Sequence, residues 1–136
     1  MNQKFNTSWK ASKRPGKQRK YLAKAPLHIK QKLVAAHLSK ELREKYKRRR
    51  VSLRKGDTVK IMAGKFKDKT GKVTKVLLKT SKILVEGIQV KKQDGSKSDV
   101  KLVPCKMQII QLNLDDKKRF KERKQTSSVR STTNKK

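Results

Sequence analysis

Residues 55–76 read KGDTVKIMAGKFKDKTGKVTKV. Near the start of this stretch Val59 and Ile61 alternate with polar residues, and a second run rich in β-branched residues follows over 71–78. Alternation of this kind is typical of a strand with one buried face. The residues between the two runs include Gly64 and Gly71. The stretch therefore predicts two strands joined by a basic loop that contains glycine.

The residues that follow continue the same pattern. We expect five strands, over 58–61, 71–78, 82–86, 100–103 and 107–112. The pair Asp94-Gly95 marks a turn between two of the later runs. Short strands with a turn signal about every ten residues are typical of a small antiparallel barrel, and no helical period intervenes. The sequence therefore predicts a mainly β fold class, with a five-stranded barrel over 51–112.

Basic segments flank this barrel on both sides. The net charge is +15 over residues 1–50, +10 over 51–112 and +6 over 113–136. We therefore divide the chain into a basic N-terminal extension (1–50), the barrel (51–112) and a basic C-terminal tail (113–136). A barrel of about 60 residues buries only some 60% of its surface, so its core is marginal by itself.

Local signals suggest some order within the two flanks. Residues 1–24 are aperiodic and too basic to order alone, so we expect them to be disordered in the free protein. Pro26 can start a helix that places Ile29, Leu33 and Ala36 on one face, and Ser39 can cap a second helix over 40–46. In the tail we expect a helix that starts at Asp115-Asp116 and runs to Lys124, followed by disorder after Gln125.

The composition limits the classes of function. The 136 residues include 41 Lys and Arg against 10 Asp and Glu, a net charge of +31, and only 4% are aromatic. Such a charge favours a polyanionic partner and makes an enzyme with a deep, dry pocket unlikely. No apolar run is long enough to span a membrane, and the N-terminal residues lack the apolar region of a secretory signal. The single cysteine, Cys105, forms no internal disulfide and fits a reducing compartment.

Cations and aromatic residues occur together in three places, which favours contact with RNA. Lysines crowd the loop between Gly64 and Lys72, a dense cationic run occupies 47–50, and Trp9 and Phe66 each neighbour lysines. Aromatic rings between cations can stack on unpaired bases, whereas Tyr46 and Phe120 fit helix packing better. The RNA-binding candidates are Trp9, Lys10, Lys13, Arg14, Lys17, Arg19, Lys20, His28, Arg48, Arg49, Arg50, Lys65, Phe66, Lys67, Lys69 and Lys72.

Interpretations of the same residues without RNA contact stay open. The loop can be an ordinary solvated hairpin, and the run 47–50 can be a solvated charge run or a nuclear-import signal. The loop is not a nucleotide-binding P-loop, because six residues separate its glycines and Val73 follows Lys72. For Gly71 we expect a backbone conformation that β-branched residues resist.

The sequence contains no pattern typical of a catalytic site. His28 and His37 are nine residues apart and, with Cys105, do not have the spacing of metal ligands. Asp115 and Asp116 are adjacent and resemble a helix start more than an acid–base pair. We therefore expect neither an enzyme nor a bound cofactor or metal.

Residues 55–65 and 69–76, with Gly71 as the key glycine, resemble the KOW motif. Residues 25–30, 38–46, 114–119 and 122–124 resemble the large-subunit ribosomal protein family numbered twenty-four in bacteria and twenty-six in eukaryotes. The likeness runs over about 4–124, and the two flanks are similar to the eukaryotic form.

The resemblance to this family implies an SH3-like barrel, with the KOW loop and the N-terminal extension contacting RNA. It implies binding to large-subunit ribosomal RNA beside neighbouring ribosomal proteins, an early role in subunit assembly and a site near the mouth of the peptide exit tunnel. We expect no membrane contact, no homo-oligomer and a cytoplasmic location, nucleolar during assembly in a eukaryote. Because the KOW motif also occurs in transcription and RNA-processing factors, an RNA-binding module of that kind is the alternative.

Overall fold

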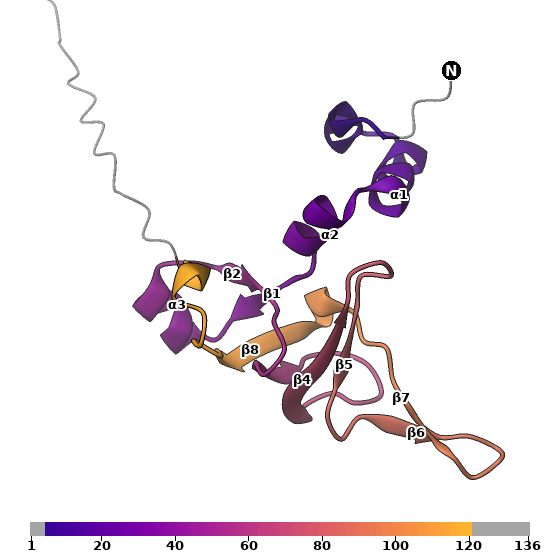
Figure 1. The fold of residues 1–136 in the computed structure, drawn as a ribbon, viewed down its shortest axis with the longest axis vertical. Coiled ribbons are helices and arrows are strands. Elements are labelled where there is room, and N and C mark those ends of the chain that lie inside the picture. Colours follow the sequence, from indigo (N-terminus) through magenta and orange to yellow (C-terminus); the bar gives the residue numbers. More distant parts are fainter. Residues whose placement is uncertain (1–4, 121–136) are drawn as a thin grey trace, which may run out of the picture.

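The computed structural model describes residues 5–120 (Figure 1). The helices are η1 (Thr7–Ala11), α1 (Pro15–Lys24), α2 (Leu27–Leu33), α3 (Lys40–Tyr46), η2 (Pro104–Lys106) and η3 (Lys117–Phe120), where η marks a 3-10 helix. The strands are β1 (Ala35–Leu38), β2 (Arg50–Ser52), β3 (Thr58–Ile61), β4 (Thr70–Leu77), β5 (Lys82–Val85), β6 (Gln89–Lys91), β7 (Lys97–Asp99) and β8 (Met107–Gln111).

Six strands form one sheet in the order β2-β1-β8-β3-β4-β5. The β1–β8 pair is parallel and the other pairs are antiparallel. Strands β6 and β7 form a separate two-stranded ribbon. In Figure 1 this ribbon and the helices α1 and α2 project from the sheet in different directions. The sheet is therefore a platform from which two extensions reach outward.

The predicted mainly β barrel is not confirmed. Of the described residues, 30% are helical and 31% lie in strands, which makes the fold mixed, and no sheet that they form closes on itself. The reason lies in residues that we assigned to the basic extension. Strand β1 comes from that extension and β2 spans its end at residue 50; both continue the sheet beyond β8, so the sheet ends at β2 instead of returning to β5. The sheet therefore crosses the boundary that the sequence predicts at residue 51.

The expected helix from Pro26 ends earlier than its hydrophobic spacing predicted. Helix α2 stops at Leu33, and Ala36 belongs to strand β1, where Ala36 and Leu38 are buried and their neighbours are not. The sequence around Ala36 fits both a helical and a two-residue period. Pairing with β2 and with β8, where Leu38 faces Ile109, decides in favour of the strand.

We expected residues 1–24 to be disordered in the free protein, whereas the structure contains helices over residues 7–11 and 15–24. Helix α1 begins at Pro15. Proline lacks a backbone N–H, and the N–H at the first helical position has no partner within the helix, so proline suits this position. Tyr21 of α1 is buried, and its ring centroid lies 5.3 Å from that of Phe5. Aromatic contacts thus supply the local core that a count of charges does not reveal.

The later expectations are confirmed in part. The Asp94-Gly95 turn joins β6 to β7, and Gly95 has a φ of +83°. The prediction of a strand at 100–103 is wrong, because β7 ends at Asp99 and Leu102 makes only an isolated bridge to Ile83. In the tail, η3 replaces the start of the expected α-helix, and the rest of the tail prediction lies outside the described residues.

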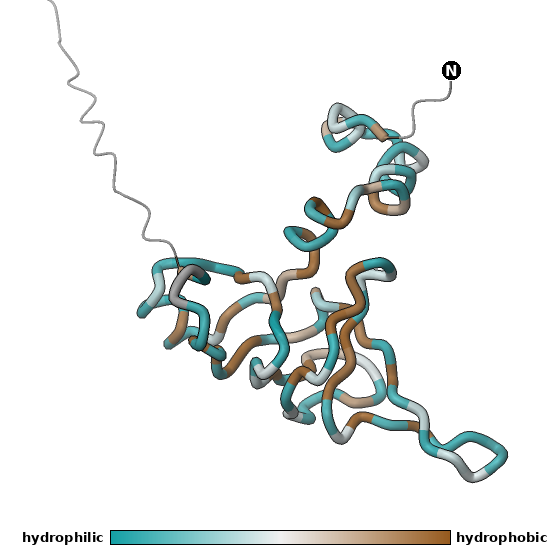
Figure 2. Tube along the Cα trace, viewed as in Figure 1, coloured by the Kyte–Doolittle hydropathy of each residue, from teal (hydrophilic) through white to brown (hydrophobic). Residues whose placement is uncertain are grey.

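Buried side chains from several strands of the six-stranded sheet form the hydrophobic core. Leu38, Val59, Ile83, Met107 and Ile109 are fully buried and come from β1, β3, β5 and β8. Figure 2 shows hydrophobic stretches along the sheet strands and hydrophilic residues at the end of the projecting ribbon. The core thus holds together strands from both ends of the chain and fixes the surfaces described next.

Candidate nucleic-acid interface

The loop between β3 and β4 is held by its own backbone. The Ile61 N–H donates to the Lys69 carbonyl at 2.9 Å, and the Asp68 N–H donates to the Ile61 carbonyl at 2.8 Å. Asp68 has a φ of +65° and pairs with Lys60 at 3.0 Å, on the adjoining strand. The lysines Lys65, Lys67, Lys69 and Lys72 are exposed on or beside this loop. The loop therefore presents several cations on a defined backbone.

Phe66 of this loop packs against the protein more than the sequence suggested. Its ring is half-buried against the hydrophobic core, and the Lys69 Nζ lies 5.6 Å from the ring centroid. A base could stack only on the part of the ring that these contacts leave open. Phe66 therefore serves partly as an anchor that holds the loop against the sheet.

The N-terminal arm, defined as residues 5–33, carries the second group of predicted residues. The Trp9 ring packs edge-on against Phe5 at 6.1 Å, and the Lys20 Nζ lies 4.7 Å from its centroid. The remaining predicted cations of η1, of α1 and of the link between them are exposed, namely Lys10, Lys13, Arg14, Lys17 and Arg19. The arm thus combines a small aromatic cluster with a basic exterior.

Lys30 fixes the arm to the sheet, a role that no sequence signal indicated. Its side chain is buried, and its Nζ donates to the Ala23 carbonyl at 3.2 Å and to the Lys79 carbonyl at 3.0 Å. Ala23 lies in α1 and Lys79 in the turn between β4 and β5. The ammonium group of Lys30 therefore links helices α1 and α2 to the turn between β4 and β5.

A third group of cations surrounds a pocket of about 540 Å³ beside α2 and β2. We name it the basic pocket, after the side chains of His28, Lys32, Arg48, Arg50, Arg54 and Arg119 that line it. The sequence predicted His28, Arg48 and Arg50; Arg49, which it also predicted, is exposed and lies outside the lining. It missed Lys32, Arg54 and Arg119, of which the first two left a local signal in the sequence. Lys32 follows His28 by one helical turn and Arg54 continues the two-residue period of β2, so correct element boundaries could have found both.

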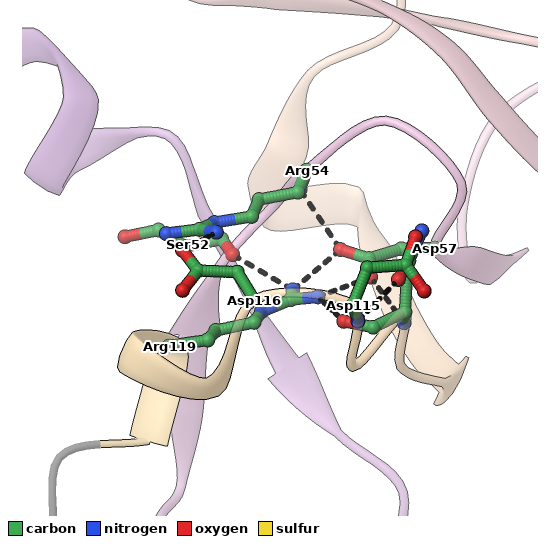
Figure 3. A network of polar contacts seen from close by, with 7 residues as sticks. Ser52, Arg54, Asp57, Asp115, Asp116 and Arg119 are labelled. Carbon is green, nitrogen blue, oxygen red and sulfur yellow. Dashed lines mark hydrogen bonds and ion pairs between the residues drawn. The ribbon is translucent and has the colours of Figure 1, made fainter.

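Asp57 and Arg119 form a buried ion pair behind this pocket (Figure 3). Both terminal guanidinium nitrogens of Arg119 donate to the carboxylate of Asp57 at 2.6 Å. The same guanidinium donates to the carbonyls of Asn113 at 2.6 Å and Ser52 at 3.1 Å. The carboxylate also accepts the backbone N–H groups of Arg54 and Asn113, at 2.8 and 3.0 Å.

This network ties the C-terminal segment to the sheet. Asp57 is the third residue of the KOW-like stretch and Arg119 lies in η3, 62 residues later, so sequence spacing gave no signal of their contact. An exposed pair between Arg54 and Asp116 supports it, and Tyr46 stacks on Phe120 at 4.3 Å, which confirms the packing role predicted for these two rings. The Arg48 guanidinium lies 5.5 Å from the Phe120 ring. The C-terminal segment thereby forms one wall of the basic pocket.

His37 faces a strongly cationic environment on β1. Partial burial, followed by repulsion from Arg43 and then from Arg49, lowers the pKa of His37 below its usual 6.5. The imidazole is therefore neutral at physiological pH. Among residues 5–120, no group of three or more His, Cys, Asp or Glu could hold a metal ion. No helix in that range is long and apolar enough to cross a membrane.

One comparison bears on the function of these surfaces. A protein-family model described as ribosomal proteins L26 of eukaryotes and L24 of archaea matches residues 12–125. The matched range contains the whole sheet, α1, α2, α3, the loop between β3 and β4 and both members of the buried ion pair.

Proposed function

Because the chain belongs to the family of ribosomal proteins L26 of eukaryotes and L24 of archaea, a family of the large subunit that acts in translation, we propose that it binds ribosomal RNA as a structural, non-catalytic constituent of that subunit. The exposed cations of the arm, the loop and the basic pocket would contact RNA phosphates. The observation that carries this proposal is their distribution, because exposed cations gather on the arm, on the loop between β3 and β4 and around the basic pocket. Release of counterions from the RNA would drive binding.

We further propose an early role in subunit assembly and a location near the mouth of the peptide exit tunnel, beside neighbouring ribosomal proteins. In this proposal the protein acts as a monomer in the cytoplasm, and in the nucleolus during assembly in a eukaryote. The division into arm, sheet and tail supports the assembly role, since a rigid sheet can position basic segments that reach between RNA helices. An RNA-binding module of a transcription or RNA-processing factor is the competing function, and a family match over residues 12–125 does not favour it.

Equilibrium binding of the full chain to transcripts of large-subunit ribosomal RNA tests the proposal. We expect submicromolar affinity at physiological salt and a steep loss of affinity as salt rises. Transfer RNA at the same nucleotide concentration is the matched polyanion control, and we expect it to bind more weakly. Equal affinity for both RNAs would show charge attraction without a ribosomal preference, and would contradict the proposal.

A further inference from the structure

The basic pocket holds more positive charge than its own ion pairs neutralise. Arg119 is paired with Asp57, and Arg54 with Asp116. Lys32 and Arg50 are exposed and make no ion pair with any residue in 5–120. None of the described residues that line the pocket is acidic. Cations gathered around a concave surface focus a positive potential on the space between them.

The elements that line the pocket are held by contacts within the chain. The side chain of Arg119 is 2% exposed and held by hydrogen bonds to Asp57, Asn113 and Ser52, while its Nε is buried and donates to no described residue. Arg50 sits in β2 opposite His37, next to buried Val51. Lys32 lies on α2, which Lys30 ties to the β4–β5 turn. The strand and the helix that carry Arg50 and Lys32 are thus held by the rest of the fold, so only the two side chains must be ordered when an anion binds.

We infer that the basic pocket binds the phosphodiester backbone of RNA, with Lys32 and Arg50 making the main phosphate contacts. This inference rests on the proposed function and names a place at which it is carried out. The pocket volume of about 540 Å³ falls within the roughly 300–1,000 Å³ of ordinary ligand sites, which leaves room for one or two successive phosphates. Arg54 and Arg48 contribute less, because Asp116 and the Phe120 ring already engage them.

A pair of charge-matched variants tests the inference in the full chain. Lys32→Gln with Arg50→Gln removes two charges from the pocket, and Lys91→Gln with Lys97→Gln removes two exposed charges from the β6–β7 ribbon. For the pocket variant we expect affinity for a large-subunit RNA transcript to fall about tenfold or more. We also expect its salt slope to fall by about one to two units, at about 0.9 for each duplex phosphate that is no longer neutralised. The ribbon variant should keep the slope of the unmodified protein.

Titration of the free protein with inorganic phosphate provides a local readout. We expect saturable NMR shifts of the Arg54 side-chain N–H signal and of the His28 ring, lost in the pocket variant and kept in the ribbon variant, and a shift of the Arg50 side-chain N–H signal in the unmodified protein. Shifts that never saturate, or that spread evenly over all cations, would overturn the inference. Displacement of RNA from the pocket by polyglutamate at matched charge would also overturn it, and would assign the pocket to an acidic protein segment.

The proposed function and the pocket assignment can fail separately. If the unmodified chain does not bind the transcript, the proposed function fails. If it binds and both double variants bind equally well, only the pocket assignment fails. Should the double variant unfold, as judged by its melting temperature, Lys32→Gln alone carries the test, because this side chain is exposed on α2.

Discussion

At the residue scale, the buried pair of Asp57 and Arg119 does most to connect the two ends of the chain. The carboxylate accepts four hydrogen bonds, two from Arg119 and two from backbone N–H groups. Removal of one partner leaves the other charge buried without compensation, which typically costs about 3–5 kcal/mol. The pair therefore holds η3 against the sheet but makes the fold sensitive to single substitutions.

Asp57→Asn should lower the free energy of unfolding by about 3–5 kcal/mol, because the Arg119 guanidinium would remain buried beside a neutral amide. Urea denaturation measures the change. Asp116→Asn is the matched control at the exposed pair with Arg54, and should cost less than about 1 kcal/mol. Equal losses for the two variants would mean that Asp57 and Arg119 do not form the buried pair described here.

Gly71 is required for a reason other than its backbone conformation. Its φ does not lie in the left-handed region, so the expectation of a special conformation is wrong. A Cβ at this position would instead lie 2.7 Å from the Glu86 carbonyl oxygen and 2.8 Å from the Val85 Cγ1. The glycine therefore permits the close approach of β4 to the end of β5.

Gly71→Ala should destabilise the protein by roughly 1–3 kcal/mol, because β4 and β5 must move apart to admit the methyl group. Gly16→Ala in α1 is the matched control, since a Cβ there meets no atom within 4 Å and alanine favours the helix. Thermal unfolding compares the two variants. A Gly71→Ala melting temperature at or above that of Gly16→Ala would contradict the steric argument.

His37 gives stability a pH dependence. Because the pKa of His37 is lower in the folded chain than its usual 6.5, the unfolded chain binds more protons just below that pH. The free energy of unfolding should therefore decrease as the pH falls from 6.5 through the folded pKa. Urea denaturation across this interval measures the decrease, and His37→Gln should reduce it. An identical pH profile for the variant would show that His37 does not contribute.

At the element scale, the loop between β3 and β4 combines a fixed backbone with solvent-exposed charges. Two backbone hydrogen bonds and the half-buried Phe66 set its path, while Lys65, Lys67 and Lys69 extend into solvent. Substitution of these lysines therefore changes charge and leaves the anchor in place. The loop is thus well suited to a test of electrostatic contact alone.

Replacement of Lys65, Lys67 and Lys69 by Ala should weaken binding to large-subunit RNA and lower the salt slope by about 0.9 for each duplex phosphate that the loop no longer binds. Filter binding at several salt concentrations measures the slope. Lys91→Ala with Lys97→Ala and Lys101→Ala is the charge-matched control. An unchanged slope in the loop variant would mean that its lysines are only solvated.

The elements also show what sequence patterns can and cannot predict. Strong alternation at Val59 and Ile61 identified β3, and Ser39 correctly marked the start of α3. The pattern around Ala36 fitted two periods, and only pairing with the neighbouring strands decided between them. Cations predicted one by one, such as His28 and Arg50, lie together in a pocket that depends on where α2 ends and β2 begins.

At the scale of the whole molecule, the 136 residues together carry a net charge of +31 around one small sheet. Self-repulsion of this size opposes compaction, and a polyanion around the arm and the loop would relieve it. The contact between Asp57 and Arg119 could not be predicted from sequence, because no local pattern links residues so far apart. The overall charge was the stronger guide to function, since it does not depend on any single contact.

The most direct test locates the protein in the cell. Cell extract is sedimented through a sucrose gradient after a moderate-salt wash, and the chain is cross-linked to RNA in each fraction. We expect it in the large-subunit fractions at about one copy per particle, cross-linked to large-subunit ribosomal RNA through the arm and the loop. Recovery mainly in the soluble fractions, or cross-links to other RNAs alone, would contradict a role as a structural constituent of the large subunit.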